Sequence, residues 1–367
     1  MALINAGTGI VNTGDNTGVL DIQGGGVTGV SVNSNGMYVK SVTTAQMAAL
    51  TAVNGMIVFN TTLAKMCQYV NGAWQQMTSA APVTGTQRAI FGYGFTSTNV
   101  SMTNLVSSTG VVAADTTGVG TVRNGLAAAS YGGDKAIFGY GDPNTSTTNL
   151  VSNTGVVANN TTGVGTARSY LAAAGYGTDK AIFGYGFSTA NTALTNLVSN
   201  AGVVATDTTG VGTARNSLAA SGYGGDKAIF GYGSTTVSVS MTNLVSSIGV
   251  VATDTAGVGT ARFNLAAAGY GGDKAIFGYG NAGSNLSITN LISNAGVVAA
   301  NTTGVGTARQ ALAAAIYGID KAIFGYGSTG SNVSLTNLVS NTGVVATDTA
   351  GVGTVRQLLA AAGYSTT

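Results

Sequence analysis

The sequence predicts an all-β protein, and three observations support this prediction. The segment AIFGYG recurs six times, 45 or 47 residues apart, beginning at Ala89, Ala136, Ala181, Ala228, Ala275 and Ala322. Each repeat holds four short apolar runs separated by Gly, Asn, Ser and Thr, a pattern typical of strands joined by turns. A four-stranded repeat of about 40–50 residues matches one blade of a β-propeller. We therefore predict a six-bladed β-propeller over residues 85–367.

The order of segments within a repeat predicts how its strands pack. AIFGYG is followed by a variable stretch, TNLVS or TNLIS, a GVVA run, an Arg, and finally LAAA or LAAS. Alternation along a strand puts Phe138 and Tyr140 on one face and Gly139 and Gly141 on the other. We expect the aromatic face of one blade to fill the space beside the glycines of its neighbour. The small LAAA side chains suit the innermost strand.

The two ends of the repeat region predict how the ring closes. The last LAAAGY segment, Leu359–Tyr364, has no AIFGYG after it, and the AIFGYG at Ala89 has no LAAAGY before it. We therefore expect a C-terminal strand at residues 358–365 to complete the first blade, which would leave no open edge. The alternative is an open solenoid of six stacked repeats.

The repeat also resembles a known family. An Arg, then Leu-Ala-Ala-Ala, a Gly-rich hairpin and a strand ending in Gly-x-Gly resemble the kelch repeat over residues 85–367. The resemblance implies a kelch-like propeller. Two features depart from the kelch pattern: the second strand ends Gly139–Tyr140–Gly141 instead of Gly-Gly, and the usual Trp of the outer strand is absent.

The first 84 residues lack the repeat and predict two smaller parts. Residues 1–38 form a β-rich anchoring or oligomerisation segment, with strands at 18–23 and 27–32 around a Gly24–Gly26 turn. Residues 39–84 form a helix-plus-β-meander module. Its helix spans 43–50 with a Thr cap, and its strands span 56–60, 66–70 and 73–77. Asn71–Gly72 is a strong hairpin signal between the last two strands.

This N-terminal region carries a second resemblance. Thr43–Met77 is similar, in the order of its residues, to a module that recurs in bacteriophage tail-fibre and other virion structural proteins. Leu20–Gly36 resembles the strand-turn units that often precede it. The resemblance implies a virion tail fibre or head fibre that forms a homotrimer through residues 1 to about 80 and contacts other virion proteins there. The alternative is a generic small β-domain on an unrelated surface protein.

Composition excludes several classes of protein. A hydrophobic fraction of 44% with a net charge of +2 indicates a buried core, although only 7% of residues are charged. No apolar run approaches the ~18–20 residues of a membrane-spanning helix, and the N-terminus does not read as a secretory signal. The few basic residues are evenly spread, so we expect no nucleic-acid binding. These features suit a virion protein released by lysis.

The residue types also argue against an enzyme. The chain has no His and no Glu, which removes the commonest general bases and metal ligands. Cys67 has no His partner, and we expect a buried structural thiol. The Gly-x-Gly patterns end strands with no helix after them, so they do not predict phosphate loops. We expect no catalytic residue, metal or cofactor. A hydrolase or lyase working through Asp and Tyr alone is the weaker alternative.

Charged residues recur at fixed places in the repeat. Asp–Lys pairs, such as Asp134–Lys135, sit in the hairpin before five of the AIFGYG copies and suit a turn role. An outer Asp, such as Asp115, is replaced by Asn160 and Asn301 in two repeats, which weakens a calcium site. We expect each repeat's Arg to tie neighbouring blades through backbone carbonyls or the hairpin Asp residues. The alternative is an axial anion site. The six are Arg123, Arg168, Arg215, Arg262, Arg309 and Arg356.

The stretch after AIFGYG varies while its flanks barely change, as expected of an exposed loop. This variation predicts six Ser/Thr/Asn-rich loops on one rim that bind a host-surface glycan or a partner; drift in an unused loop is the alternative. The candidate receptor-binding residues are Phe95, Asn99, Asp142, Asn144, Phe187, Asn191, Ser234, Asn281, Asn285, Ser328 and Asn332. The predicted function is a non-enzymatic phage virion appendage for host attachment. The alternative function is a soluble, lectin-like carbohydrate-binding protein of cellular origin.

Overall fold

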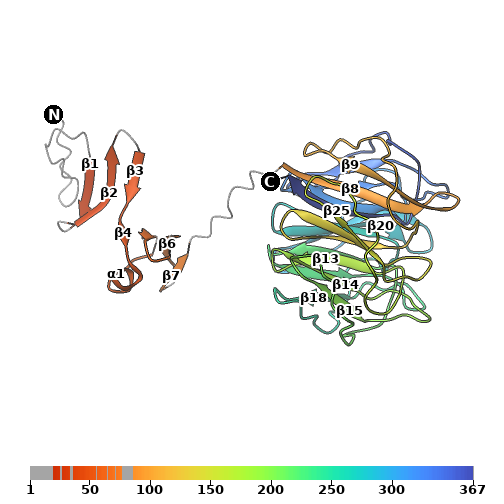
Figure 1. Ribbon diagram of the computed structural model, residues 1–367, viewed down its shortest axis with the longest axis horizontal. Helices are drawn as coiled ribbons and strands as arrows, with labels where there is room; N and C mark the ends of the chain where they lie inside the picture. Colours follow the sequence, from red (N-terminus) through yellow and green to blue (C-terminus); the bar gives the residue numbers. More distant parts are fainter. Residues whose placement is uncertain are drawn as a thin grey trace. The chain divides into compact units, whose positions relative to one another are not determined.

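The computed structural model describes residues 20–24, 27–33, 36–54, 56–63, 65–70, 72–76 and 86–366. The chain divides into two compact units, Met1–Pro82 and Val83–Thr367, which are described separately (Figure 1). Some predicted features lie outside the described residues: the start of the anchoring segment up to residue 19, the turn residues Gly25 and Gly26, Asn71 of the hairpin, and Met77.

The described residues of the first unit form two sheets. Strands β1 (Leu20–Gly24), β2 (Val27–Asn33) and β3 (Gly36–Val39) form an antiparallel sheet. The second sheet has the order β4 (Ser41–Val42), β5 (Ile57–Asn60), β6 (Lys65–Val70) and β7 (Ala73–Gln76). Strand β4 pairs parallel with β5, and the other pairs are antiparallel.

The predicted helix of this unit is present as α1 (Thr44–Ala48). Thr43 caps it: its hydroxyl accepts from the Gln46 backbone N–H, and the Gln46 side chain accepts from the Thr43 N–H. The helix places Met47 over the second sheet. The buried core around Met47 is small and consists of Val42, Met47, Val58 and Cys67, with Leu50 and Trp74 partly buried against it.

The second unit is built from six separate antiparallel sheets of three strands each. In chain order they are β8 (Thr86–Phe95) and β9 (Asn99–Val106) with β25 (Ala360–Thr366); β10 (Ala127–Tyr131), β11 (Lys135–Gly139) and β12 (Thr148–Val151); β13 (Ala172–Tyr176), β14 (Lys180–Gly184) and β15 (Thr195–Val198); β16 (Ala219–Tyr223), β17 (Lys227–Gly231) and β18 (Thr242–Val245); β19 (Ala266–Tyr270), β20 (Lys274–Asn281) and β21 (Asn285–Ile292); and β22 (Ala313–Tyr317), β23 (Lys321–Gly325) and β24 (Thr336–Val339).

This architecture contradicts the prediction of a six-bladed kelch-like β-propeller. The described residues are all-β apart from α1, but they form separate sheets of three or four strands and no closed or propeller-like sheet. The fourth apolar run of each repeat forms only isolated bridges, such as Val151 with Val157 and Thr148 with Thr161. Between these bridges the Asn149 side chain donates to the Ala158 carbonyl at 2.9 Å, so a side chain interrupts the backbone ladder.

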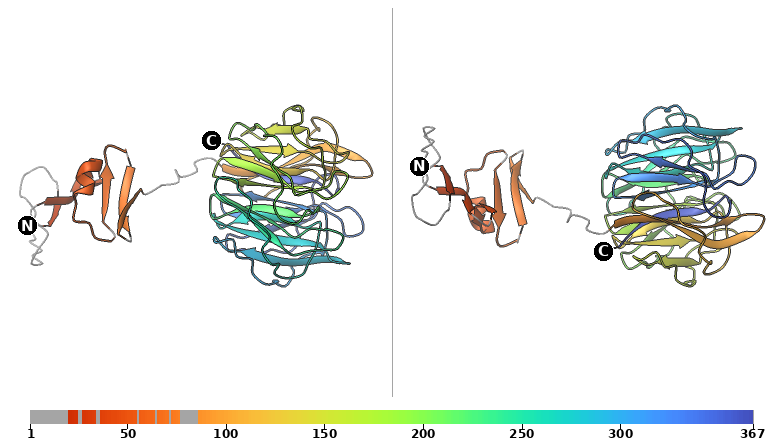
Figure 2. Two further views of the ribbon diagram at one scale, coloured as in Figure 1. Left: turned by 90° about the horizontal axis from the view of Figure 1, so that it is seen from below. Right: turned by 90° about the horizontal axis from the view of Figure 1, so that it is seen from above.

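The six sheets lie side by side in cyclic order (Figures 1 and 2). Their first strands contact one another in the sequence β25, β10, β13, β16, β19, β22 and back to β25. The sheet that combines both ends of the unit forms because β25 pairs with β8, from Ala360 opposite Gly92 to Thr366 opposite Thr86.

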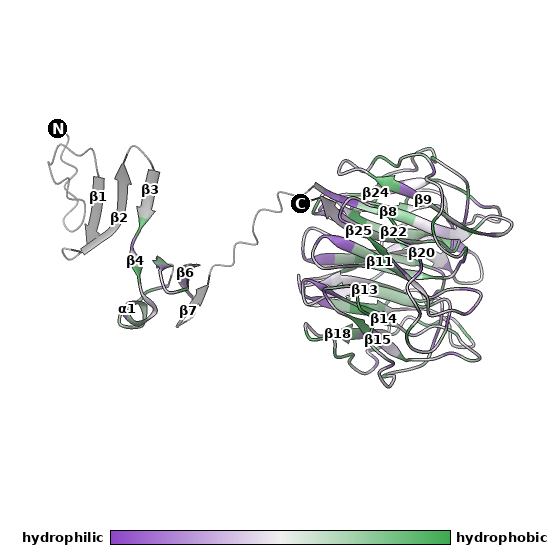
Figure 3. Cartoon of the chain, viewed as in Figure 1, coloured by the Kyte–Doolittle hydropathy of each residue, from purple (hydrophilic) through white to green (hydrophobic). Residues whose placement is uncertain are grey.

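The phenylalanine of one sheet packs onto a glycine of its neighbour, as expected. Tyr140 does not share the face of Phe138, however: with a φ of 64° its ring meets Phe183 of the next sheet, whereas Phe138 meets Tyr93 of the preceding sheet. A Cβ added at Gly139 would lie 2.7 Å from Cζ of Phe183, and the same close approach joins Gly325 to Phe91 across the first and last sheets. The ring of Phe183 also meets Tyr140 at a centroid distance of 5.1 Å. These apolar strands, green in Figure 3, form the core between sheets, so a side chain at these glycines would separate neighbouring sheets.

Strand direction gives this unit two distinct ends. Hairpins such as Gly132–Asp134 join the first and second strands at one end, which we call the hairpin end. The variable loops, such as residues 140–147, lie at the opposite end, which we call the loop end. Strand β8 begins at Thr86 opposite Thr366, so the chain enters this unit at the hairpin end.

Candidate functional site

Six arginines, one before the first strand of each sheet, are completely buried. Arg168 shows the pattern: Nε donates to the Tyr185 carbonyl at 2.9 Å and Nη1 to the Thr166 carbonyl at 3.1 Å. Its Nη2 donates to Oδ1 of Asn196 at 2.6 Å. The guanidinium lies over the ring of Tyr140 in the preceding sheet, 4.5 Å from the centroid. All three nitrogens of Arg168 therefore donate to protein atoms.

Four of the arginines also lie near a carboxylate, that of the outer Asp of the repeat. Of the two partners that we expected, the backbone carbonyls are present and the hairpin Asp is not. Asp207 lies 3.7 Å from Nη1 of Arg168 and accepts hydrogen bonds from Thr166 and Asn196. Burial alone would raise the pKa of Asp207, but these hydrogen bonds and the charge of Arg168 outweigh it and hold the pKa below its usual value. Asp115, Asp254 and Asp348 make the same contacts in their own sheets.

Two arginines lack this carboxylate. Asn160 and Asn301 replace it near Arg123 and Arg262, and each still bonds the threonine of the connecting segment. Arg123 differs further, because its Nε has no hydrogen-bond partner among the described residues. The Asp/Asn position is thus a clamp on the segment that connects two sheets, which fits its interchange of charge and amide.

The Asp–Lys pairs lie in the exposed hairpins. Lys180 Nζ is 2.9 Å from Asp179 Oδ1, and both side chains are about a third or more exposed. Surface pairs of this kind contribute little to stability. The hairpin backbones also link neighbouring sheets, since the Gly132 N–H donates to the Asp179 carbonyl of the next hairpin at 2.7 Å.

The asparagines predicted to bind a receptor connect adjacent loops. Asn144 donates to the Ser188 carbonyl of the next loop at 2.9 Å, and Asn332 donates to the Thr96 carbonyl at 2.8 Å. Five of the predicted residues make this contact: Asn99, Asn144, Asn191, Asn285 and Asn332. The six others begin the loops and form isolated bridges to the residue after each arginine: Phe95, Asp142, Phe187, Ser234, Asn281 and Ser328. Receptor binding by these side chains stays a prediction.

A ring of six residues at the loop end was not singled out from the sequence. Each member comes two residues after an arginine and directly before the leucine that leads into a first strand. The backbone N–H of each donates to the carbonyl of the preceding member at 2.7–2.9 Å, and the chain of six bonds closes on itself. We call this the axial ring: Gly125, Tyr170, Ser217, Asn264, Ala311 and Leu358.

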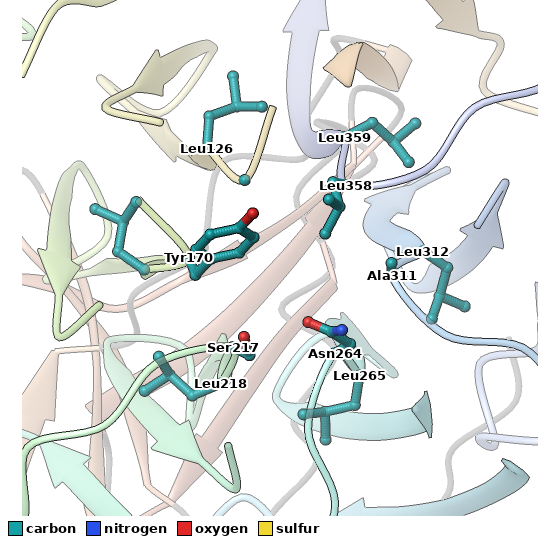
Figure 4. Close-up of a pocket in the computed structure, with 12 residues that line it drawn as sticks. Leu126, Tyr170, Ser217, Leu218, Asn264, Leu265, Ala311, Leu312, Leu358 and Leu359 are labelled. Carbon is teal, nitrogen blue, oxygen red and sulfur yellow. The ribbon is translucent and has the colours of Figure 1, made fainter. Parts of the chain in front are cut away.

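The axial ring lines a small depression with a cavity volume of about 70 Å³ (Figure 4). Tyr170, Asn264 and Leu358 lie around its centre, and the leucine after each ring member forms its wall. Burial and the charge of Asp142 raise the pKa of Tyr170. The signal in the sequence was a position that differs in all six repeats between an invariant Arg and an invariant Leu.

Among the described residues, no three side chains of the metal-binding types His, Cys, Asp and Glu form a cluster that could hold a metal ion. Cys67 is buried in the core of the first unit. Over the ranges that the structure describes, no helix has the length and apolar character needed to cross a membrane.

The comparison with protein families concerns the N-terminal part of the chain. Residues 7–98 match the family described as a phage tail like trimerisation region. This range includes the strands β1 to β7 described in the first unit and reaches through β8 of the second. No curated protein matches the chain. The kelch-like resemblance is not confirmed. The family match supports a structural role in a phage tail, as a virion component, and a homotrimer.

Proposed function

We propose that this protein is a non-enzymatic, trimeric phage tail appendage, whose second unit presents its loop end for attachment to a host-cell surface glycan. The observation that carries the proposal is the polarity of the second unit. The chain enters this unit at the hairpin end, and the variable loops and the axial ring lie at the opposite end. An appendage anchored through its N-terminal region needs this arrangement.

The first unit supports assembly as a trimer. Its module of about 40 residues is at the size where oligomerisation usually supplies missing stability. Among its described residues, a cluster of four hydrophobic side chains is buried. On the sheet face opposite α1, Ile57 is 39% exposed, and Phe59 lies directly across from Met66 on β6. Contacts with two other copies would cover these apolar side chains.

The assembly part of the proposal is tested by light scattering on the full-length protein. We expect three copies per particle for the wild type and a smaller species for I57D, because a carboxylate on the apolar face opposes contact. The control is A45D, which places the same charge on the exposed surface of α1 and leaves the trimer intact. A monomeric wild type would contradict the proposal.

The attachment part is tested with intact particles and host cells. We expect mass spectrometry to find the protein in purified virions and the full-length protein to bind purified host surface polysaccharide. Absence from virions contradicts the appendage, and absence of binding to both host cells and host polysaccharide contradicts the attachment role.

A further inference from the structure

The axial ring combines a uniform backbone with six different side chains. Its backbone N–H and C=O groups are used in the closed chain of hydrogen bonds, so only the side chains distinguish one position from the next. The flanking Arg and Leu are the same in all six repeats. Variation at this single position therefore changes the chemistry of the depression without changing its frame.

Most of these side chains are present despite an unfavourable backbone. All six members have a positive φ of 52–56°, a left-handed conformation that glycine adopts freely and that other residues avoid. Only Gly125 is a glycine. Tyr, Ala and Leu have no intrinsic preference for this conformation, yet three ring members are Tyr170, Ala311 and Leu358. Strained positions of this kind cluster at binding sites, where the side chain has a task besides stability.

The side chains are also sorted around the ring. Tyr170, Ser217 and Asn264 are consecutive and make one polar half, and Ala311, Leu358 and Gly125 make an apolar half. Gly125 leaves room for the ring of Tyr170, because an added Cβ would lie 3.0 Å from Tyr170 Cε1. The Tyr170 hydroxyl makes no hydrogen bond to a described residue and can serve a ligand.

The lining indicates a neutral ligand. No charged side chain lines the depression, and the arginine two residues before each ring member is completely buried. Asn264 offers an amide donor and acceptor and has one long contact, 3.4 Å to Gln310. A hexose ring presents hydroxyl groups along its edge and C–H groups on its face, which match a half-polar, half-apolar site. The small volume suits one terminal sugar and no longer segment.

We propose that the axial ring is a binding site for a single neutral sugar residue at the end of a glycan. The proposal rests on the attachment function given above and assigns that function a specific subsite. Tyr170 and Asn264 hydrogen-bond the sugar hydroxyl or acetamido groups, and Leu358 with the leucine wall contacts its C–H face.

The test uses the full-length protein with D-glucose, N-acetyl-D-glucosamine and the acidic sugar N-acetylneuraminic acid as probes, followed by NMR titration. We expect one of the two neutral sugars to bind with millimolar affinity and the acidic sugar to bind at least tenfold more weakly. The double variant Y170G/N264G should weaken neutral-sugar binding at least tenfold. Its melting temperature should stay equal or rise, because glycine suits the left-handed backbone.

The matched control is T178G. Thr178 also has a positive φ, 71°, but lies in a hairpin at the opposite end, so T178G should leave binding unchanged. The inference is overturned if neither neutral sugar binds the wild type, if Y170G/N264G binds as well as T178G, or if the double variant melts well below the wild type. If Y170G/N264G binds host polysaccharide as well as the wild type, the axial site is contradicted and the attachment function stands. If the wild type itself binds no host polysaccharide, both proposals are contradicted.

Discussion

The buried arginines make unequal contributions to stability, and a pair of substitutions measures the difference. Arg168 makes three hydrogen bonds and lies 3.7 Å from Asp207. Arg123 bonds only the Thr121 carbonyl and Asn149, its Nε has no partner, and no carboxylate is paired with it. Both stack on a tyrosine at nearly the same distance, 4.5 and 4.3 Å. Methionine fills a similar elongated space, so R168M and R123M differ mainly in the polar contacts they remove.

The expected size of the difference follows from these contacts. A hydrogen bond involving a charged group contributes about 1.5–3 kcal/mol. R168M loses one more such bond than R123M and leaves Asp207 without its cation. We therefore expect R168M to lower the free energy of unfolding by about 2–3 kcal/mol more than R123M. For a unit of this size, that difference corresponds to roughly 4–12 °C in melting temperature.

Calorimetry of the full-length variants measures this difference, since the second unit dominates the heat of unfolding by its size. Circular dichroism at the same temperatures checks that both variants are folded before heating. Equal losses for the two variants, or a larger loss for R123M, would refute the reasoning that the Nε bond and the carboxylate set the strength of each arginine contact.

Three further predictions follow from features of the second unit. I319G should raise the free energy of unfolding by about 1 kcal/mol, because Ile319 is a β-branched residue with a φ of 78°. The opposite change at the matching position of another repeat, G133I, should lower it by a similar amount or more. Denaturant unfolding curves of both variants measure these changes. The wild type should lose stability as pH falls below about 4, because the pKa of Asp207 is lowered in the folded protein. D207N should be less stable than the wild type at pH 7 but should lose less stability in acid. Thermal melts across this pH range test the prediction, and a D207N curve parallel to that of the wild type would contradict it. Deletion of β25 should unfold or aggregate the second unit, since it unpairs β8, whereas removal of residues 1–84 should leave that unit folded; an unchanged melting temperature after the deletion would be the contrary result.

The sequence allowed the strands to be predicted well where side-chain chemistry repeats. The AIFG part of AIFGYG and the residues after the Leu of LAAA or LAAS are strands in every repeat, and the packing of Phe183 against Gly139 follows from the alternation of aromatic and glycine residues. The Thr43 cap of α1 was predicted, whereas the reciprocal bond from Gln46 that completes the capping box was not. Short β4 was not predicted, because two residues carry no periodic signal.

The number of strands per sheet could not be predicted in the same way. The GVVA run has the composition of a strand, but the Asn149 amide takes the carbonyl that a ladder would use, and that competition is visible only in three dimensions. The partner of each arginine was missed for a similar reason. Asp207 and the hairpin Asp179 look alike in the repeat, and only the crossing of the connecting segment brings Asp207 to Arg168. The axial ring has no sequence motif, because its six positions carry six different residues.

The pairing of β25 with β8 has a mechanical consequence. Strand β8 is the middle strand of its sheet, held by seven residue pairs to β25 and by six to β9. Tension between a bound loop end and the N-terminal residues acts along β8 from Thr86. It shears both ladders at once, so their hydrogen bonds must break together instead of opening one after another from an edge. A tether attached at this strand transmits force into the body of the unit, as the proposed attachment function would require.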